Sequence, residues 1–181
     1  MELKAGDVFC SSYTGDLSKM IRKWQKLLAS DNKAKYSHSG IILNPKGDTF
    51  EALRRTGRFN LFKRYRGSKV VIARYLKISE EEWENIIEKF ILKYEDEIYP
   101  YYRFFLNLFP PLAKYINFSK KKLICSELVA KFLYVGFLKY GTTENGVPWP
   151  RHEHFYGTNP DRLSDEWHRW KNYKIIFEGI L

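Results

Sequence analysis

Short apolar runs separated by turn residues dominate the first half of the chain. They are rich in Val, Ile, Phe and Tyr, the residue types that favour β-strands. They lie at residues 8–13, 36–43, 48–54 and 69–76. Turn residues in Asn44-Pro45-Lys46-Gly47-Asp48 separate the second run from the third, so we expect these two strands to form an antiparallel hairpin. A later run at residues 173–177 predicts a strand that closes the sheet.

A helical period is clearest after Ser79, which stands three residues before Glu82 as in a capping box. The apolar side chains that follow recur on one helical face, at Trp83, Ile86, Ile87, Phe90, Ile91 and Tyr94. Asp16 precedes a similar pattern, with apolar positions Leu17, Met20, Ile21, Trp24 and Leu28. Both segments predict amphipathic helices.

Cys125 opens a third helical pattern, in the run Leu123-Ile124-Cys125-Ser126-Glu127-Leu128-Val129. We expect this helix to end near Gly136 or Gly141. Two other long segments lack a sustained period: residues 97–118 predict an irregular aromatic segment, and residues 141–170 predict a turn-rich excursion. Strands and helices together predict a single α+β domain over residues 1–181.

Composition narrows the compartment and the partners. The formal net charge of +10 at pH 7 favours anionic partners, such as nucleic acid, an anionic membrane surface or an acidic cell-wall polymer. The two cysteines, Cys10 and Cys125, do not indicate a disulfide framework, although one bridge between them stays an open alternative. The sequence after Met1 has no signal-peptide pattern, and no apolar run is long enough to span a bilayer. We therefore expect a soluble cytoplasmic protein; the sequence leaves its oligomeric state open.

Cys125 is the leading candidate nucleophile. A thiolate, not a thiol, attacks a carbonyl group, so a catalytic cysteine needs a lowered pKa. The start of a helix supplies unpaired N–H groups and a partial positive charge, which favour the anion. A buried structural cysteine is the equally weighted alternative at this position. Cys10 lies inside an expected strand, and we expect it to serve in packing.

His38 and Glu51 supply the other two groups that a cysteine hydrolase needs. His38 stands near the start of a strand that becomes apolar at Ile41, and Glu51 lies across the expected hairpin. Antiparallel pairing brings the carboxylate to the imidazole Nδ1, where it fixes the tautomer and stabilises the imidazolium. Strand alternation places Glu51 on the face opposite Phe50. The simpler alternatives are a solvated strand carboxylate and a surface or core histidine.

The remaining histidines, His152, His154 and His168, lie in the expected excursion. His152-Glu153-His154 has the composition of a metal site, but no second ligand pair stands at a zinc-like spacing. We therefore predict neither a metal nor a cofactor. The chain also has no glycine-rich phosphate loop and no serine nucleophile elbow.

The order of the candidate groups, with His38 and Glu51 before Cys125, is the reverse of that in papain-like proteases. The chain resembles the circularly permuted branch of the NlpC-type papain-like superfamily, especially the YiiX-like hydrolases. The matching stretches are Gly6-Asp7-Val8-Phe9, Tyr36-Ser37-His38-Ser39-Gly40-Ile41, Phe50-Glu51-Ala52 and Cys125-Ser126-Glu127-Leu128-Val129. Weaker matches are Tyr99-Pro100-Tyr101-Tyr102 and Asn159-Pro160-Asp161-Arg162-Leu163-Ser164.

The resemblance implies a permuted papain-like core, in which a small antiparallel sheet packs against the helix that carries the cysteine. It implies Cys125 as nucleophile, His38 as base and Glu51 as the residue that orients the base. The chemistry it implies is cleavage of an amide bond, in a peptide or a cell-wall polymer, through an acyl-enzyme. The substrate-binding residues that it suggests are Ser37, Ser126 and Tyr102.

Two other functions remain open. In a lipid-directed enzyme the same three residues would hydrolyse or transfer an acyl group at a membrane, and residues 99–118 would suit an interfacial loop. Packing of that segment across the Cys125 helix is the simpler explanation.

The third hypothesis is a non-catalytic module that binds anions. The densest basic stretch of the chain contains Arg54, Arg55, Arg58, Lys63, Arg64 and Arg66. The aromatic residues interleaved with them, Phe59, Phe62 and Tyr65, are of the type that stacks on nucleic-acid bases. A solvated strand and loop explains this stretch more simply. We do not expect nucleic acid as a partner.

Overall fold

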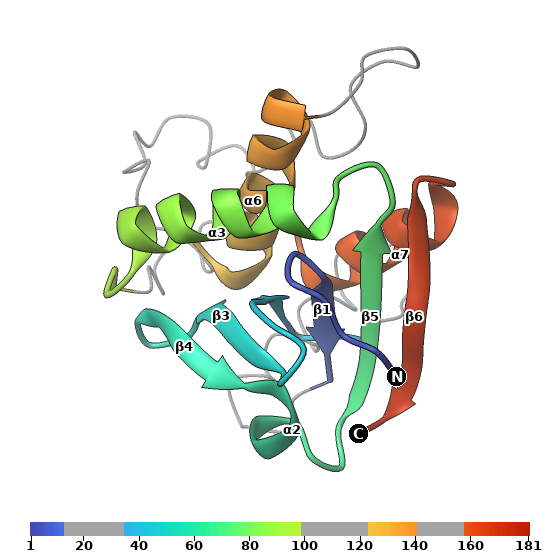
Figure 1. Cartoon of the computed structure of the whole chain (residues 1–181). Helices are drawn as coiled ribbons and strands as arrows, with labels where there is room; N and C mark the ends of the chain where they lie inside the picture. Colours follow the sequence, from blue (N-terminus) through green and yellow to red (C-terminus); the bar gives the residue numbers. More distant parts are fainter. Residues whose placement is uncertain (13–34, 99–122, 141–157) are drawn as a thin grey trace, which may run out of the picture.

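The computed structural model describes residues 1–12, 35–98, 123–140 and 158–181. An antiparallel sheet of six strands lies at its centre, in the order β4-β3-β2-β1-β5-β6 (Figure 1). The strands are β1 (Val8–Ser11), β2 (His38–Ile42), β3 (Asp48–Ala52), β4 (Thr56–Asn60), β5 (Lys69–Tyr75) and β6 (Tyr173–Ile180). The α+β class expected from the sequence is therefore confirmed.

Four helices accompany the sheet in the described part of the chain. They are α2 (Leu61–Arg64), α3 (Glu80–Tyr94), α6 (Cys125–Tyr140) and α7 (Pro160–Arg169). The capping box at the start of α3 is present, because the Ser79 hydroxyl accepts from the Glu82 N–H and the Glu82 carboxylate accepts from the Ser79 N–H at 2.7 Å. Within the described residues, no helix has both the length and the apolar character that a membrane crossing requires.

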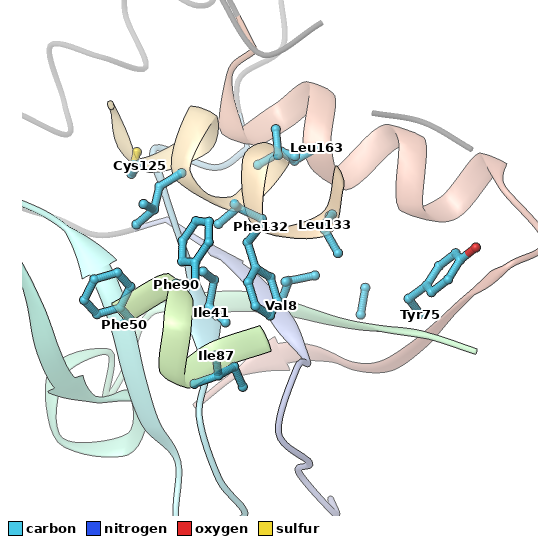
Figure 2. Packing of buried hydrophobic residues seen from close by; sticks show 14 of the residues in the cluster. Val8, Ile41, Phe50, Tyr75, Ile87, Phe90, Cys125, Phe132, Leu133 and Leu163 are labelled. Atoms are coloured by element: carbon cyan, nitrogen blue, oxygen red, sulfur yellow. The ribbon is translucent and has the colours of Figure 1, made fainter. Parts of the chain in front are cut away.

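Alternate strand residues face two separate apolar clusters, because successive side chains of a strand point to opposite faces. The larger cluster joins the sheet to the three longer helices. Figure 2 shows Phe90 of α3 and Phe132 of α6 directed toward Ile41 of β2 within this cluster. The smaller cluster, on the other face, includes Phe9 of β1 and Leu61 of α2. Burial on both faces explains why the central strands are so apolar.

The opening Gly6-Asp7 pair fixes the start of β1 against its neighbours. Gly6 has a φ of +87°, and a Cβ there would lie 2.1 Å from the indole of Trp83. Asp7 is buried, and its two carboxylate oxygens accept from the guanidinium of Arg74 on β5 at 2.8 and 2.9 Å. The Lys4 N–H donates to the same carboxylate. This ion pair ties the start of β1 to the neighbouring strand β5.

The structure agrees with the sequence-based prediction in part. The predicted strands and the helices that begin near Ser79 and Cys125 are confirmed, with slightly different bounds. The helix expected after Asp16 and nearly all of segment 97–118 lie outside the described residues. The turn-rich excursion over 141–170 was wrong in its last part, because Asn159 caps α7 there by accepting from the Arg162 N–H at 2.9 Å.

Candidate active site

Cys125 is the first residue of α6, and only 4% of it is exposed. The start of the helix is well defined, because the Ile124 N–H donates to the Glu127 carboxylate at 3.2 Å. Burial disfavours the thiolate, but it is outweighed by the charge of His38, the hydrogen bond to His38 and the N–H and hydroxyl of Ser39. These interactions lower the pKa of the Cys125 thiol. The thiol therefore has the environment of a nucleophile.

His38 is the first residue of β2 and contacts both other members of the site. Its Nε2 lies 2.9 Å from Oε2 of Glu51. Burial lowers the pKa of His38, but the charge and hydrogen bond of Cys125, followed by those of Glu51, raise it to about 9. A raised pKa of His38 and a lowered pKa of Cys125 both favour a thiolate–imidazolium pair.

The contact between His38 and Glu51 corrects one detail of the sequence-based prediction. The carboxylate was expected at Nδ1, whereas the structure places it at Nε2, which leaves Nδ1 as the ring nitrogen available to Cys125. The ring orientation decides this. The His38 ring packs against the rings of Phe9 and Tyr65, at centroid distances of 6.5 and 6.0 Å, and these two rings also contact each other.

Glu51 is fully buried on β3, so it is not the solvated carboxylate of the simpler alternative. Besides His38, two hydroxyl groups reach it. The Thr49 hydroxyl donates to Oε1 and the Tyr65 hydroxyl donates to Oε2, each at 2.5 Å. A buried charge is costly unless it is paired and hydrogen-bonded. The contacts with His38, Thr49 and Tyr65 supply this pairing and hydrogen bonding to the Glu51 carboxylate.

Gly40 allows this close packing, and its replacement by Ala is expected to disturb the site. Gly40 lies opposite Glu51 in the sheet, and a Cβ there would approach the Phe9 ring to 2.6 Å and Cγ of Glu51 to 2.7 Å. We expect Gly40→Ala to lower the free energy of unfolding by about 2 kcal/mol in urea titrations.

Gly57→Ala is the matched control for this prediction. Gly57 of β4 lies opposite Glu51 on its other side, but a Cβ there meets no atom closer than 3.8 Å. Its stability should change by less than about 1 kcal/mol. Equal losses for the two variants would contradict the packing argument.

The other sequence-predicted site residues have different surroundings. The Ser126 hydroxyl is buried and donates to the Thr158 carbonyl, which links α6 to the segment before α7. Ser37 is also buried, and its N–H donates to the Ser11 carbonyl at 2.9 Å. Tyr102 lies outside the described residues. A substrate-binding role for these three residues stays a prediction.

The remaining candidates do not join the site. Cys10 is fully buried, its thiol lies 3.3 Å from the Pro160 carbonyl, and burial raises its pKa well above the ordinary value. Both cysteines are free, so they form no bridge. His168 lies on α7, where its ring nitrogens face the Ser164 carbonyl and Glu178. His152 and His154 lie outside the described residues.

Three residues near the site were not assigned to it from the sequence. Thr49 stands two residues before Glu51 on the same strand, so strand alternation could have placed both on one face. Ser39 stands two residues before Ile41 on β2, so strand alternation could have placed it on the same face as Ile41, which packs in the cluster with α6. Tyr65 carried no such signal. Its buried contact with Glu51 also removes it from the stacking groups considered for anion binding.

Comparison with known proteins finds a similarity among solved structures. No protein-family model and no curated protein matches the chain. Among solved structures, the chain is similar to the metalloprotein YiiX from Escherichia coli O157:H7, a DUF1105 protein. The TM-score is 0.65 at 18% sequence identity, and the alignment covers 100% of both chains. At this identity, the similarity concerns the fold.

Because YiiX is described as a metalloprotein, the fit of a metal ion to this chain can be tested on its own residues. Within the described ranges, no group of three or more His, Cys, Asp and Glu side chains is placed to hold one. At Cys125 the candidate ligands are engaged with one another: Nε2 of His38 faces Glu51, and both Glu51 oxygens accept from hydroxyl groups. These residues do not fit a resident metal.

The fold similarity and the site contacts lead to one conclusion. The chain has a YiiX-like α+β fold that brings Cys125, His38 and Glu51 together where α6 begins.

Proposed function

We propose that the chain is a cysteine hydrolase that cleaves an amide bond, in a peptide or a cell-wall polymer, through an acyl-enzyme on Cys125. The observation that carries the proposal is the position of His38, which contacts the Glu51 carboxylate through Nε2 and the Cys125 thiol through the same ring. The succession of thiol, imidazole and carboxylate resembles that of a papain-like site whose groups occur in a permuted order along the chain. The YiiX-like fold is consistent with that arrangement.

The three groups have distinct roles in the proposed reaction. The Cys125 thiolate attacks the carbonyl carbon, and the electrons of the C=O bond move to the oxygen. The N–H of Cys125, at the start of α6, is the donor best placed for this oxyanion. The His38 imidazolium then gives its proton to the leaving nitrogen as the C–N bond breaks, which leaves an acyl-enzyme and a neutral imidazole.

Deacylation returns the site to its starting charges. Neutral His38 removes a proton from water, and the resulting hydroxide attacks the thioester carbonyl. The C–S bond breaks, Cys125 leaves as the thiolate, and the acid product is released. His38 is then an imidazolium again. Throughout, Glu51 holds the ring through Nε2 and stabilises its positive charge.

The anion-binding alternative draws less support from the described residues. Most of its basic side chains are exposed on β4, α2 and the segments that flank them. Arg58 pairs with Glu95 at 3.3 Å, Arg55 donates to the Asp96 carbonyl, and Arg64 lies over the Phe59 ring. These contacts are those of a solvated surface. The Tyr65 hydroxyl donates to Glu51, so this ring is not a surface group for stacking. The lipid-directed alternative depends on residues 99–118, which lie outside the described residues.

Alkylation of the two thiols tests the proposal. Cys10 and Cys125 are both buried, so burial alone would protect them alike. At near-neutral pH we expect iodoacetamide to modify Cys125 at least about 10-fold faster than Cys10, since only Cys125 has a lowered pKa. Peptide mapping by mass spectrometry gives the two rates. Rapid labelling should disappear in Cys125→Ala, and equal labelling of both thiols would refute the proposal.

A further inference from the structure

We infer that Tyr65 and Thr49 are positioning residues. Their hydroxyl groups fix the orientation of the Glu51 carboxylate, so that it holds the His38 ring in contact with Cys125. The inference rests on the proposed function, because it assigns roles within the same site. It starts from the two hydroxyl groups that contact Glu51 from different parts of the fold. Thr49 lies on β3 itself, and Tyr65 directly follows α2.

Each oxygen of the Glu51 carboxylate has its own hydroxyl donor. Thr49 donates to Oε1, and Tyr65 donates to Oε2, the oxygen that also faces Nε2 of His38. The carboxylate cannot rotate about its last bond without breaking hydrogen bonds in a fully buried site, where unmet polar groups are costly. The direction in which Oε2 faces His38 is therefore set by the two hydroxyl groups.

Tyr65 is itself firmly placed. It is fully buried, and its ring lies 5.3 Å from that of Phe9 and stacks on that of His38 with an interplanar angle of 21°. Burial, followed by the charge and hydrogen bond of Glu51, raises the pKa of Tyr65, although Arg64 opposes this. The hydroxyl thus keeps its proton and stays a donor at every pH at which the protein would be assayed.

Loss of the Tyr65 hydroxyl has opposite effects under two explanations. The groups that act on the charge of His38 are Glu51 from β3 and Cys125 from α6, and both raise its pKa. If Tyr65 positions Glu51, its removal loosens the contact with His38, and the pKa of His38 falls. If Tyr65 only stabilises the negative charge of the Glu51 carboxylate, its removal strengthens the attraction between that charge and the His38 imidazolium. The pKa of His38 then rises. The sign of the change separates the two.

Titration of His38 by NMR, with isotope-labelled histidine, tests the inference. We expect Tyr65→Phe to lower the pKa of His38 by about 1 pH unit, and to slow the alkylation of Cys125 at mildly alkaline pH by roughly 10-fold. An unchanged or higher pKa of His38 in this variant would overturn the inference. The titration needs no substrate, so it gives this answer even if Cys125 proves unreactive, which would count against the proposed function alone.

Three further variants test the inference even if the Tyr65→Phe variant does not fold. Thr49→Val removes the second donor and should also lower the pKa of His38, whereas Thr49→Ser keeps a hydroxyl and should restore it. Tyr75→Phe is the control for loss of a buried tyrosine hydroxyl, because Tyr75 of β5 packs on Phe137 and Tyr173, away from Glu51. It should leave His38 unchanged. Equal behaviour of Thr49→Val and Thr49→Ser would contradict the role of the hydroxyl groups.

Discussion

Replacing Cys125 by Ala is expected to reduce hydrolysis at least about 10⁴-fold, because no group then remains to form the acyl-enzyme. Suitable probes are an activated ester such as p-nitrophenyl acetate and a set of peptide amides, measured as initial rates. Since Cys125 is the first residue of a buried helix and is small, Ala should fit its place. The loss should therefore appear without a loss of folded protein, as followed by circular dichroism.

Cys10→Ala is the matched control for this experiment. Both cysteines are buried and free, but the Cys10 thiol contacts the Pro160 carbonyl instead of an imidazole. Its removal should leave the rate per folded molecule within about 2-fold of the wild-type rate. A substitution outside the three reacting groups changes the stability of the fold and not the chemical step. Mass spectrometry of the quenched reaction should find the acyl group on Cys125. Full hydrolysis by Cys125→Ala would assign the chemistry to another nucleophile.

Replacing His38 by Gln is expected to produce the second large effect, a loss of roughly 10³-fold, because both proton transfers depend on this ring. The charge and hydrogen bond of His38 are also the leading interactions that favour the Cys125 thiolate against its burial. The variant should therefore lose thiolate at neutral pH as well. Hydrolysis rates over a range of pH measure both effects.

The expected pH profile follows from the two shifted groups. The thiolate–imidazolium pair exists above the lowered pKa of Cys125 and below the pKa of His38, which is raised to about 9. Acylation should hence fall on the alkaline side near that value, as His38 loses its proton. In His38→Gln this alkaline fall should vanish. His168→Gln is the control, because His168 faces the Ser164 carbonyl and Glu178 on the surface; an equal loss there would contradict the assignment of His38.

Much of the fold could be predicted because its signals are local. Strand alternation, the turn after Leu43 and the capping box at Ser79 each depend on residues that are close in the sequence. β4 was not predicted, since Gly57 and Asn60 are poor strand formers and the strand depends on its pairing with β3. α7 was missed because its buried apolar side chains, Leu163 and Trp167, are few among charged residues.

The candidate site divides in the same way. Cys125, His38 and Glu51 could be chosen from residue type, position and family order. The ring nitrogen that faces Glu51 could not be predicted, because it depends on how the imidazole packs against Phe9 and Tyr65, which come from distant segments. Tyr65 lies in a stretch whose sequence emphasises positive charge, and only the turn after α2 brings its hydroxyl to Glu51. Contacts between distant segments carry no local pattern.

The most direct test of the central claim is a titration of the Cys125 thiolate by its ultraviolet absorbance, in a Cys10→Ala background. The account predicts that Cys125 ionises below the ordinary pKa of a cysteine, about 8.5, and that His38→Gln shifts its ionisation to at least that value. Ionisation of Cys125 at or above the ordinary value in the presence of His38 would contradict the account, because a buried thiol would then be neutral where catalysis requires a thiolate.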